Sequence, residues 1–324
     1  MRRYTALDAL AADLARPAYL ALGTFDGVHL GHRSVITTML QAARSAGAPG
    51  VVLTFAPHPL AVLRPEAAPP LLADFDQRAA YCRELGVDAL VELRFDATLA
   101  AVPAAMFVQD YLCHQARARR AFVGADFTFG ARAAGTAETL AVLGRQACGL
   151  ETTIVPLRLR GGAPISSTRI RQALGAGRVG EAARLLGHPF TLRGAVVPGD
   201  RRGASLGFPT ANLPLPPTVA QPAPGVYAVR CRLAPTDEPG REPNPADAWD
   251  AVANLGRRPT VGGGEPRLEV HLLGFSGDLY GRCLEVAFIR RLRAERRFPD
   301  LARLGAQIAK DVERARAALG RAGA

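Results

Sequence analysis

The stretch LGTFDGVHLGH, residues 22–32, combines two histidines with closely spaced glycines. His29 and His32 lie three residues apart, so they share one face of a helix or of its first turn. Gly23, Gly27 and Gly31 let a ligand approach the backbone closely, and the N–H groups at a helix start attract phosphate. The pattern favours a site for nucleotide phosphates. A purely structural turn, or a zinc site that includes Asp26, are the alternatives.

Any phosphate chemistry in this chain must work almost without lysine. Lys310 is the only lysine, so a P-loop lysine and the strand lysine of protein kinases are excluded. The segment ISSTRIR (165–171) offers hydroxyls and arginines at an expected helix start. Such a segment is either a plain helix cap or a clamp for a triphosphate, and we favour the clamp. Its candidate residues are Ser166, Ser167, Thr168 and Arg171.

Two further loops carry polar side chains. His58 stands between two prolines in TFAPHP (54–59), which restrict the loop and hold the side chain in place. A lone histidine is as often structural as functional, and both interpretations stay open for His58. Asp126 lies in the loop GADFTFG (124–130).

The second half of the chain contains a different set of candidates. LGFPTANL (206–213) places oxygen donors on Thr210 and Asn212, two residues apart, which suits Mg²⁺ and its phosphates. A turn between strands, capped by these side chains, is the structural alternative. Glu269 in RLEVHL is a candidate general base or an ordinary solvent-facing carboxylate.

The pattern of apolar residues in the first half predicts alternating strands and helices. The expected strands cover 18–23, 50–55, 89–95, 121–124 and 152–157, and the expected helices cover about 30–45, 74–86 and 103–117. Such alternation predicts a Rossmann-like α/β fold with a parallel sheet. Ligands of such sheets bind beyond the carboxyl ends of the strands, where the candidate loops would converge.

After about residue 186 the pattern changes to strands bounded by glycine, proline and aspartate. The expected strands cover 194–199, 225–233, 251–256, 267–275 and 283–289; a long loop covers 234–247 and a helix about 299–319. In RLEVHLL, Leu268, Val270 and Leu272 should point inward and Glu269 and His271 outward. This pattern of short strands separated by turn residues predicts a small antiparallel β-barrel with a C-terminal helix. GAGRVG (175–180) matches a dinucleotide fingerprint but follows a helix, so we interpret it as a turn between helices.

Composition limits the class of protein. A length of 324 residues fits two domains. The net charge of +11 comes almost wholly from dispersed arginines, so we expect no nucleic-acid partner. We also expect no membrane segment and no signal peptide. The five cysteines are scattered and lack C-x-x-C spacing, which argues against disulfides and for a cytoplasmic protein.

Taken together, the motifs resemble the bacterial bifunctional riboflavin kinase/FMN adenylyltransferase family, also called FAD synthetase, over nearly the whole chain. They are, in family order, GTFDGVHLGH, TFAPHP, VGADFTFG, ISSTRIRQAL, GDRRGASLGFPTANL, PGVYAV, NLGRRPTV, LEVHLLGFSGDLYG and RLRAERRFPDL. The resemblance implies an FMN adenylyltransferase domain over 1–186 and a riboflavin kinase domain over 187–324. Riboflavin, FMN and ATP would be the substrates, FMN and FAD the products, Mg²⁺ the cofactor, and the protein a monomer or weak homo-oligomer.

The resemblance also implies residue roles. In the first domain His29, His32 and Arg171 would act in catalysis, while His58, Pro59 and Asp126 would contact the flavin side. In the second domain Glu269 would be the catalytic base and Thr210 and Asn212 would bind the metal. The ATP-binding residues would be Gly23, Phe25, Asp26, Gly27, Ser166, Ser167 and Thr168 in the first domain, and Gly207, Pro209, Thr210 and Asn212 in the second.

Four positions, in three places, depart from the family pattern. They are Thr24 in place of Asn, Thr136 in place of an acidic residue, and Ala204–Ser205 in place of Arg–Thr. The last change would loosen a flap over the kinase nucleotide. A flavin-responsive regulator without catalysis and an arginine-rich RNA binder are the rival functions, and the complete phosphate motifs disfavour both.

Overall fold

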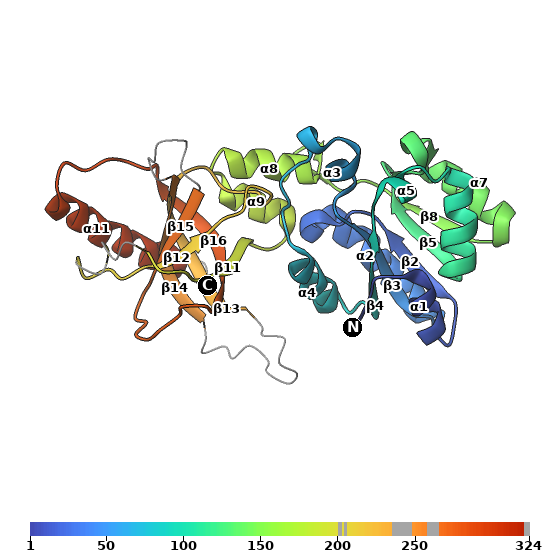
Figure 1. Ribbon diagram of the computed structural model, residues 1–324, viewed down its shortest axis with the longest axis horizontal. Helices are drawn as coiled ribbons and strands as arrows, with labels where there is room; N and C mark the ends of the chain where they lie inside the picture. Colours follow the sequence, from blue (N-terminus) through green and yellow to red (C-terminus); the bar gives the residue numbers. More distant parts are fainter. Residues whose placement is uncertain (200–202, 204–205, 235–247, 258–265, 321–324) are drawn as a thin grey trace. The chain divides into compact units, whose positions relative to one another are not determined.

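Contacts within the chain separate two units, Met1–Ser167 and Thr168–Ala324, in the computed structural model (Figure 1). The structure describes residues 1–199, 203, 206–234, 248–257 and 266–320. Ala204–Ser205 and nearly all of the loop expected over 234–247 lie outside the described residues. The expected boundary between 186 and 187 stays a prediction, because the contacts group residues 168–186 with the second unit.

A parallel sheet of six strands forms the centre of the first unit, in the order β1-β4-β3-β2-β5-β8. After the edge strand β1, the chain forms β2 near the middle of the sheet. Strands β3 and β4 then follow on one side of β2, and β5 and β8 follow on its other side. The order therefore reverses at β2, where open α/β sheets bind their ligands. The strands are β1 (Arg2–Tyr4), β2 (Ala18–Leu22), β3 (Gly50–Ala56), β4 (Ala89–Arg94), β5 (Ala118–Gly124) and β8 (Glu151–Val155).

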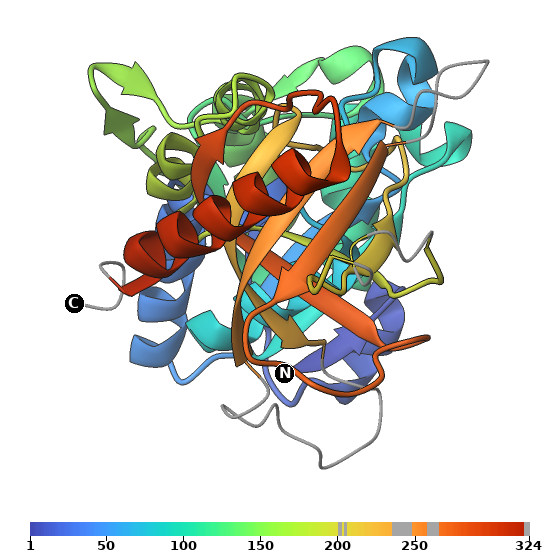
Figure 2. The same cartoon turned by 90° about the vertical axis from the view of Figure 1, so that its left-hand side faces the viewer.

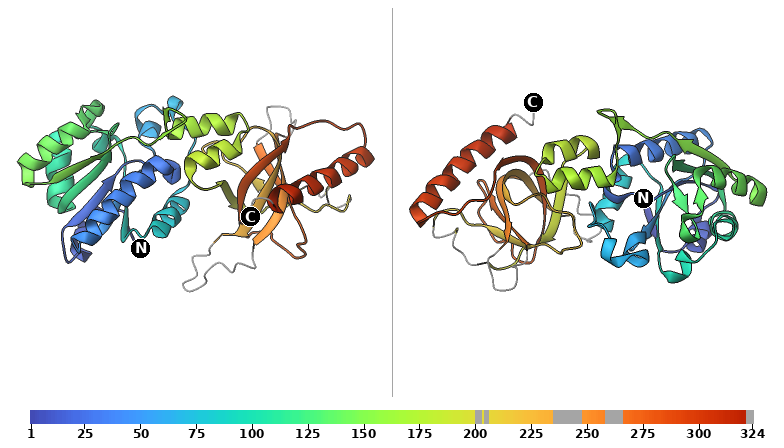
Figure 3. Two further views of the ribbon diagram at one scale, coloured as in Figure 1. Left: turned by 180° about the vertical axis from the view of Figure 1, so that it is seen from behind. Right: turned by 90° about the horizontal axis from the view of Figure 1, so that it is seen from above.

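Helices cover both faces of this sheet (Figures 1 and 3). On one face, Ala21, Val52 and Leu90 of the strands pack with α2 and α4. On the other, Leu20 and Leu53 pack with α1, α7 and the π-helix Phe107–Gln115. The helices of the unit are α1 (Leu7–Asp13), α2 (Leu30–Ser45), α3 (Pro59–Leu63), α4 (Phe75–Leu85), α5 (Ala97–Ala100), α6 (Ala104–Met106) and α7 (Ala137–Cys148).

Short elements complete the first unit. They are the 3-10 turns Asp26–Val28, Pro65–Ala67 and Ala131–Ala133, and the short strands β6 (Thr128–Phe129), β7 (Gly135–Thr136), β9 (Leu159–Arg160) and β10 (Ala163–Pro164). The α/β prediction is confirmed for this unit, with β5 starting three residues earlier than expected. Sequence analysis missed β1, because a strand of three residues with two arginines has no apolar pattern.

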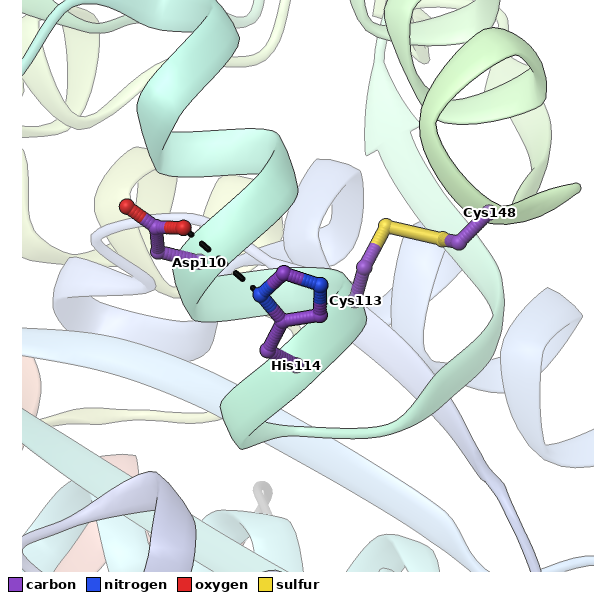
Figure 4. Close-up of a disulfide and its surroundings, with 4 residues drawn as sticks. All are labelled: Asp110, Cys113, His114 and Cys148. Atoms are coloured by element: carbon purple, nitrogen blue, oxygen red, sulfur yellow. Dashed lines mark ion pairs between the residues drawn. A yellow bond between two sulfur atoms is a disulfide. The ribbon is translucent and has the colours of Figure 1, made fainter.

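One prediction about the cysteines is wrong. Cys113 and Cys148 form a disulfide, with their Cα atoms 6.1 Å apart (Figure 4). Cys113 lies in the π-helix and Cys148 is the last residue of α7, and these two helices cover the same face of the sheet. The pairing arises from this packing, which a sequence separation of 35 residues does not reveal. Beside the bond, His114 Nδ1 lies 3.6 Å from Asp110 Oδ1 (Figure 4).

The second unit contains an antiparallel sheet of six strands in the order β11-β16-β13-β14-β15-β12. The two edge strands approach each other, since Val197 just after β11 donates its N–H to the Asn212 carbonyl of β12 at 2.9 Å. The sheet is thus a nearly closed barrel, as predicted. Its strands are β11 (Phe190–Ala195), β12 (Ala211–Pro214), β13 (Gly225–Leu233), β14 (Ala248–Arg257), β15 (Pro266–Leu272) and β16 (Cys283–Arg293).

Helix α11 (Leu301–Gly320) crosses the outside of this barrel (Figure 2). Its residues Ala315, Ala318 and Leu319 pack on Val226 and Val252. Two shorter helices, α8 (Ser167–Gly175) and α9 (Val179–Leu186), include the ends of GAGRVG (175–180), and residues 176–178 between them form the predicted turn. In the described residues, none of the helices is long and apolar enough to cross a membrane.

The strand expected at 194–199 is displaced toward the N-terminus. β11 ends at Ala195 and buries Phe190 and Leu192, and Pro198 lacks the N–H that a paired strand needs. β12, which contains the PTAN asparagine, was not predicted because two prolines flank its short apolar run. The inward and outward pattern of β15 is confirmed: Leu268, Val270 and Leu272 are buried.

Candidate active sites

The turn after β2 leads directly into helix α2. His29 is the N-cap of α2, and its Nδ1 accepts the backbone N–H of His32 at 3.2 Å. The two imidazole rings stack, with centroids 3.6 Å apart and planes 15° apart. The expectation that the histidines share one face of a helix start is confirmed.

Burial makes the charged form of His32 costly. His29 is 5% exposed, and the Nδ1 atom of His32 is buried without a hydrogen-bond partner among the described residues. Burial, together with the neighbouring His29, lowers the pKa of His32 well below its usual 6.5. The edge of Phe25 closes the other side of this ring at 5.3 Å. The neutral form of His32 is therefore favoured at this position.

Gly31 leaves room for the His29 ring in this stack. A Cβ at this position would lie 3.0 Å from Cε1 and 3.1 Å from Nδ1 of His29, so a side chain would push the imidazole away. Gly27 adopts φ 77° in the turn, a left-handed conformation that glycine enters without strain. The spacing H-x-G-H thus has a steric cause as well as a chemical one.

A cavity of about 510 Å³ opens at the carboxyl edge of the sheet, beside the histidines. As the topology predicts, its walls come from the segments that follow β2, β3, β5 and β8, and the segment after β4 also contributes. The lining contains both polar and apolar residues. Gly23, Thr24, His29, His32, Asp126, Ser166 and Ser167 offer polar groups; Phe55, Leu60, Leu63, Phe95, Phe107, Phe127 and Phe129 offer aromatic or aliphatic side chains.

Two candidate residues, Asp26 and Ser167, make hydrogen bonds within and around the turn. Asp26 is buried behind the turn, where its Oδ1 accepts the N–H groups of Leu72 at 2.9 Å and Ala73 at 3.3 Å. Ser167 begins α8 and donates its hydroxyl to the Asp26 carbonyl at 3.1 Å. Both contacts stabilise the turn.

The remaining candidates for the adenylyl transfer site are His58, Pro59, Thr168 and Arg171. Pro59 lines the cavity, while His58 caps α3 by accepting the Leu60 N–H at 3.2 Å. Thr168 and Arg171 continue helix α8 and are grouped with the second unit. Their roles at the phosphates stay predictions.

One residue at this site was missed by sequence analysis. Arg78 of α4 is 7% exposed and donates to the carbonyl of Thr24 at 3.2 Å. The only signal in the sequence is an arginine at a position of α4 that faces the sheet, next to the buried Ala79 and Cys82.

In the second unit, three polar residues lie in register on adjacent strands. Glu269 of β15 pairs with Asn212 of β12 on one side and Asn254 of β14 on the other. Side chains of directly paired antiparallel residues project from the same face with Cβ atoms about 5 Å apart. The three side chains therefore form a row, which Val226 of β13 continues. Asn254 was not among the predicted residues.

Thr210 and Pro209 line another cavity, of about 340 Å³, together with Phe275, Asp278 and Tyr280; Asn212, Glu269 and Asn254 are not among the residues that line it. The Pro209 carbonyl lies 2.8 Å from His271 Nδ1, which anchors the segment before β12. Gly207 adopts φ 83° in the turn that leads into this segment. The structure therefore brings Thr210, Asn212 and Glu269 to one part of the barrel.

The two sites offer different chemistry. The first combines imidazoles with an apolar cavity of a size that takes a planar ring system and a phosphate. The second combines a carboxylate with neutral oxygen donors, the set required to accept a proton and to hold a hard cation at a phosphate. In the described residues, no cluster of three or more His, Cys, Asp or Glu is placed to hold a metal unaided.

Comparison with known proteins relates these sites to two enzyme domains. The family model for FAD synthetase matches residues 12–169, and that for riboflavin kinase matches residues 186–319. The bifunctional riboflavin kinase/FMN adenylyltransferase of Escherichia coli K12 is 41% identical over 292 residues, or 90% of each chain. The protein of the same name from Bacillus subtilis is 34% identical over 302 residues, which cover 91% of this chain and 90% of that one.

A solved structure from Streptococcus pneumoniae, named a macrolide-efflux protein, aligns with 97% of this chain and 98% of its own. Its TM-score is 0.81 and its sequence identity is 33%. The two domain matches and the full-length relatives agree in content and in order. The chain belongs to the bifunctional riboflavin kinase/FMN adenylyltransferase family, with an FAD synthetase domain followed by a riboflavin kinase domain.

Proposed function

We propose that FMN and ATP react in the cavity at the carboxyl edge of the first unit's sheet. The observation that carries this proposal is a single cavity whose lining includes both the stacked His29–His32 pair and several aromatic side chains. The isoalloxazine ring of FMN would pack on the side of Phe127 and Phe129. Its phosphate would then face the histidines, as would the phosphates of ATP.

In the proposed reaction, an oxygen of the FMN phosphate attacks the α-phosphorus of ATP. One P–O bond forms as the bond to pyrophosphate breaks, so no covalent intermediate with the protein is needed. The task of the protein is to position both phosphates and to stabilise the negative charge that they share. We assign this task to His29, His32 and the turn at Gly23–Gly27. Ser166, Ser167, Thr168 and Arg171 would hold the β- and γ-phosphates.

We assign the riboflavin kinase reaction to the row of Asn212, Glu269 and Asn254 and to the PTAN segment that contains Thr210. The Glu269 carboxylate would accept the proton of the ribityl hydroxyl as that oxygen attacks the γ-phosphorus of ATP. ADP then leaves. The in-register pairing of Glu269 with Asn212 supports this assignment, because it places a base next to an oxygen donor.

Mg²⁺ fits this second site. The Nδ2 atom of Asn212 donates to the Thr210 carbonyl at 3.3 Å, so the opposite end of the amide is an oxygen acceptor. Mg²⁺ is usually held by one or two protein oxygens together with substrate phosphates and waters, which matches the donor set of Thr210 and Asn212. When bound, the ion would neutralise charge on the phosphates.

Other properties belong to the same proposal. We place the boundary between the catalytic domains at 186/187 and expect a cytoplasmic monomer or weak homo-oligomer. We propose small-molecule partners only, namely riboflavin, FMN and ATP, with neither nucleic acid nor membrane as a partner.

Two crossed substitutions test the assignment of the sites. His29→Asn removes the imidazole but keeps an N-cap acceptor for the His32 N–H, and Glu269→Gln removes the charge without changing the shape. With riboflavin and Mg-ATP, His29→Asn should accumulate FMN and form little FAD. Glu269→Gln should form little FMN from riboflavin yet convert added FMN to FAD. If either variant loses both steps while remaining folded, the two-site assignment is wrong.

A further inference from the structure

The turn that carries the histidines adopts a conformation that its own residues disfavour. Phe25 has φ 46° and Val28 has φ 40°, values in the left-handed region that non-glycine residues rarely adopt. For the β-branched Val28 this conformation is especially unfavourable. Such backbone persists only where the surrounding structure holds it, and it concentrates at functional sites.

Two sets of hydrogen bonds hold this turn, and both join it to residues 72–78. The first set is made by the Asp26 carboxylate, which accepts the backbone N–H groups of Leu72 and Ala73. The second set is made by the guanidinium of Arg78. Its Nη1 donates to the Thr24 carbonyl at 3.2 Å and to the Thr54 hydroxyl at 3.0 Å.

The second set is a small closed network. The Thr54 hydroxyl also donates to the Thr24 carbonyl at 2.9 Å, so this carbonyl accepts two hydrogen bonds. The Nη2 atom of Arg78 lies 3.2 Å from Glu92 Oε1, which fixes the other side of the guanidinium. Thr54 is 1% exposed and Arg78 is 7% exposed. The planar fork of arginine is needed to reach Thr24, Thr54 and Glu92 at once.

We propose that Arg78 is a positioning residue for adenylyl transfer, acting through the Thr24–Phe25 peptide. In a trans peptide the N–H lies opposite the carbonyl. Holding the Thr24 carbonyl against Arg78 therefore turns the Phe25 N–H away from α4, to the side of the turn where Thr24 and Phe25 line the cavity. The same hydrogen bonds to the Thr24 carbonyl position the backbone that leads to His29, the N-cap of α2. This inference rests on the proposed location of the adenylyl transfer site.

Four variants separate positioning from general stability. Arg78→Met removes the fork, and Arg78→Lys keeps the charge but offers a single ammonium group. Arg78→Met combined with Glu92→Gln avoids a lone buried carboxylate. Thr54→Val removes one donor to Thr24 and leaves the ion pair intact. Arg3→Met is the matched control, because Arg3 also contacts α4, through Phe75 and Asp76, on an exposed surface.

The expected result is a loss of kcat/KM for ATP in the conversion of added FMN to FAD. Arg78→Met, alone or with Glu92→Gln, should lose about 10- to 100-fold, the scale at which a misplacement of about 1 Å slows an enzyme. Arg78→Lys and Thr54→Val should fall between these variants and the wild type, and the KM for FMN should change less than that for ATP. Phosphorylation of riboflavin, performed by the other domain of the same chain, should not change.

Thermal unfolding is measured for every variant. If the Arg78 variants unfold at lower temperature but keep wild-type kcat/KM for ATP, Arg78 is only structural and the inference is overturned. The same holds if Arg3→Met loses as much activity as Arg78→Met. If instead His29→Asn retains full FAD synthesis, the proposed site is wrong, independently of Arg78.

Discussion

The imidazole rings of His29 and His32 stack with their centroids 3.6 Å apart at the first turn of α2. Two protonated rings at this distance would repel each other strongly in a buried setting. Burial and the neighbouring ring therefore lower the pKa of His32. This relationship gives the first prediction.

Stability should decrease as the pH falls below about 6.5, in part because of His32. Its pKa in the folded protein lies below the usual 6.5, so between these two values the unfolded chain binds more protons than the folded chain. The contribution of His32 is fully present above about pH 6.5 and is lost progressively below it. Denaturant unfolding measured from pH 7.5 to pH 5 should show a shallower decline in His32→Gln. His114→Gln, an exposed histidine, is the control and should follow the wild type.

Binding of ATP should favour the protonated form of His32, which burial disfavours in the free protein. Phosphate oxygens beside the pair favour the protonated form of an imidazole, so binding at about pH 6.5 should take up protons. Calorimetry of ATP binding to Glu269→Gln, in buffers of different ionisation enthalpy, measures this uptake. His32→Gln combined with Glu269→Gln should show less of it, and equal uptake in both proteins would contradict the idea.

How far the sequence predicts this molecule differs between the two domains. Helix α2 and strand β3 follow from apolar periodicity alone, and the cavity follows from the topology of a parallel sheet. The barrel strands at 190–195 and 211–214 were harder to predict, because prolines and short length obscure the alternation of apolar and polar residues. Arg78, Asn254 and the Cys113–Cys148 pair were missed for one reason. Each depends on which residues of distant segments become neighbours, and local patterns carry no record of that.

The Cys113–Cys148 disulfide should stabilise the first domain. Closing a loop of 35 residues contributes about 4 kcal/mol in the chain-entropy model. Cys148→Ser should therefore lower the melting temperature of this domain, and a dithiol reductant should do the same to the wild type without affecting the variant further. Cys283→Ser, which changes a free cysteine, is the control. Five titratable thiols in the unfolded, unreduced protein would show that the bond is absent, because Cys82 and Cys231 are buried in the folded protein.

Asn254 should matter for the kinase reaction alone. It lies beside Glu269 in register, opposite Asn212, so its amide is placed to hydrogen-bond the carboxylate or the substrate. Losing a hydrogen bond to a charged group costs about 1.5–3 kcal/mol, or roughly 10- to 100-fold in rate or affinity. Asn254→Ala should lower kcat/KM for riboflavin phosphorylation by about that factor and leave adenylylation of added FMN unchanged. A normal kinase rate would remove Asn254 from the site.

A buried ion pair strengthens the apolar contact between α11 and the barrel. Asp311 of α11 is 1% exposed, and its Oδ2 accepts from Arg293 of β16 at 2.8 and 2.9 Å while its Oδ1 accepts from Gln307. Asp311→Asn leaves the Arg293 charge without its partner, and breaking a buried pair in this way costs about 3–5 kcal/mol.

The unfolding transition of the kinase domain should shift by that amount in Asp311→Asn, with the FAD synthetase domain unaffected. The matched control is Asp300→Asn, which removes the exposed pair with Arg303 and should cost less than about 1 kcal/mol. Because Arg293 also pairs in register with Val226, which continues the row of Asn254 and Glu269, we expect kinase activity to fall together with stability. Equal denaturation midpoints for the two variants would mean that helix α11 is held by its apolar contacts alone.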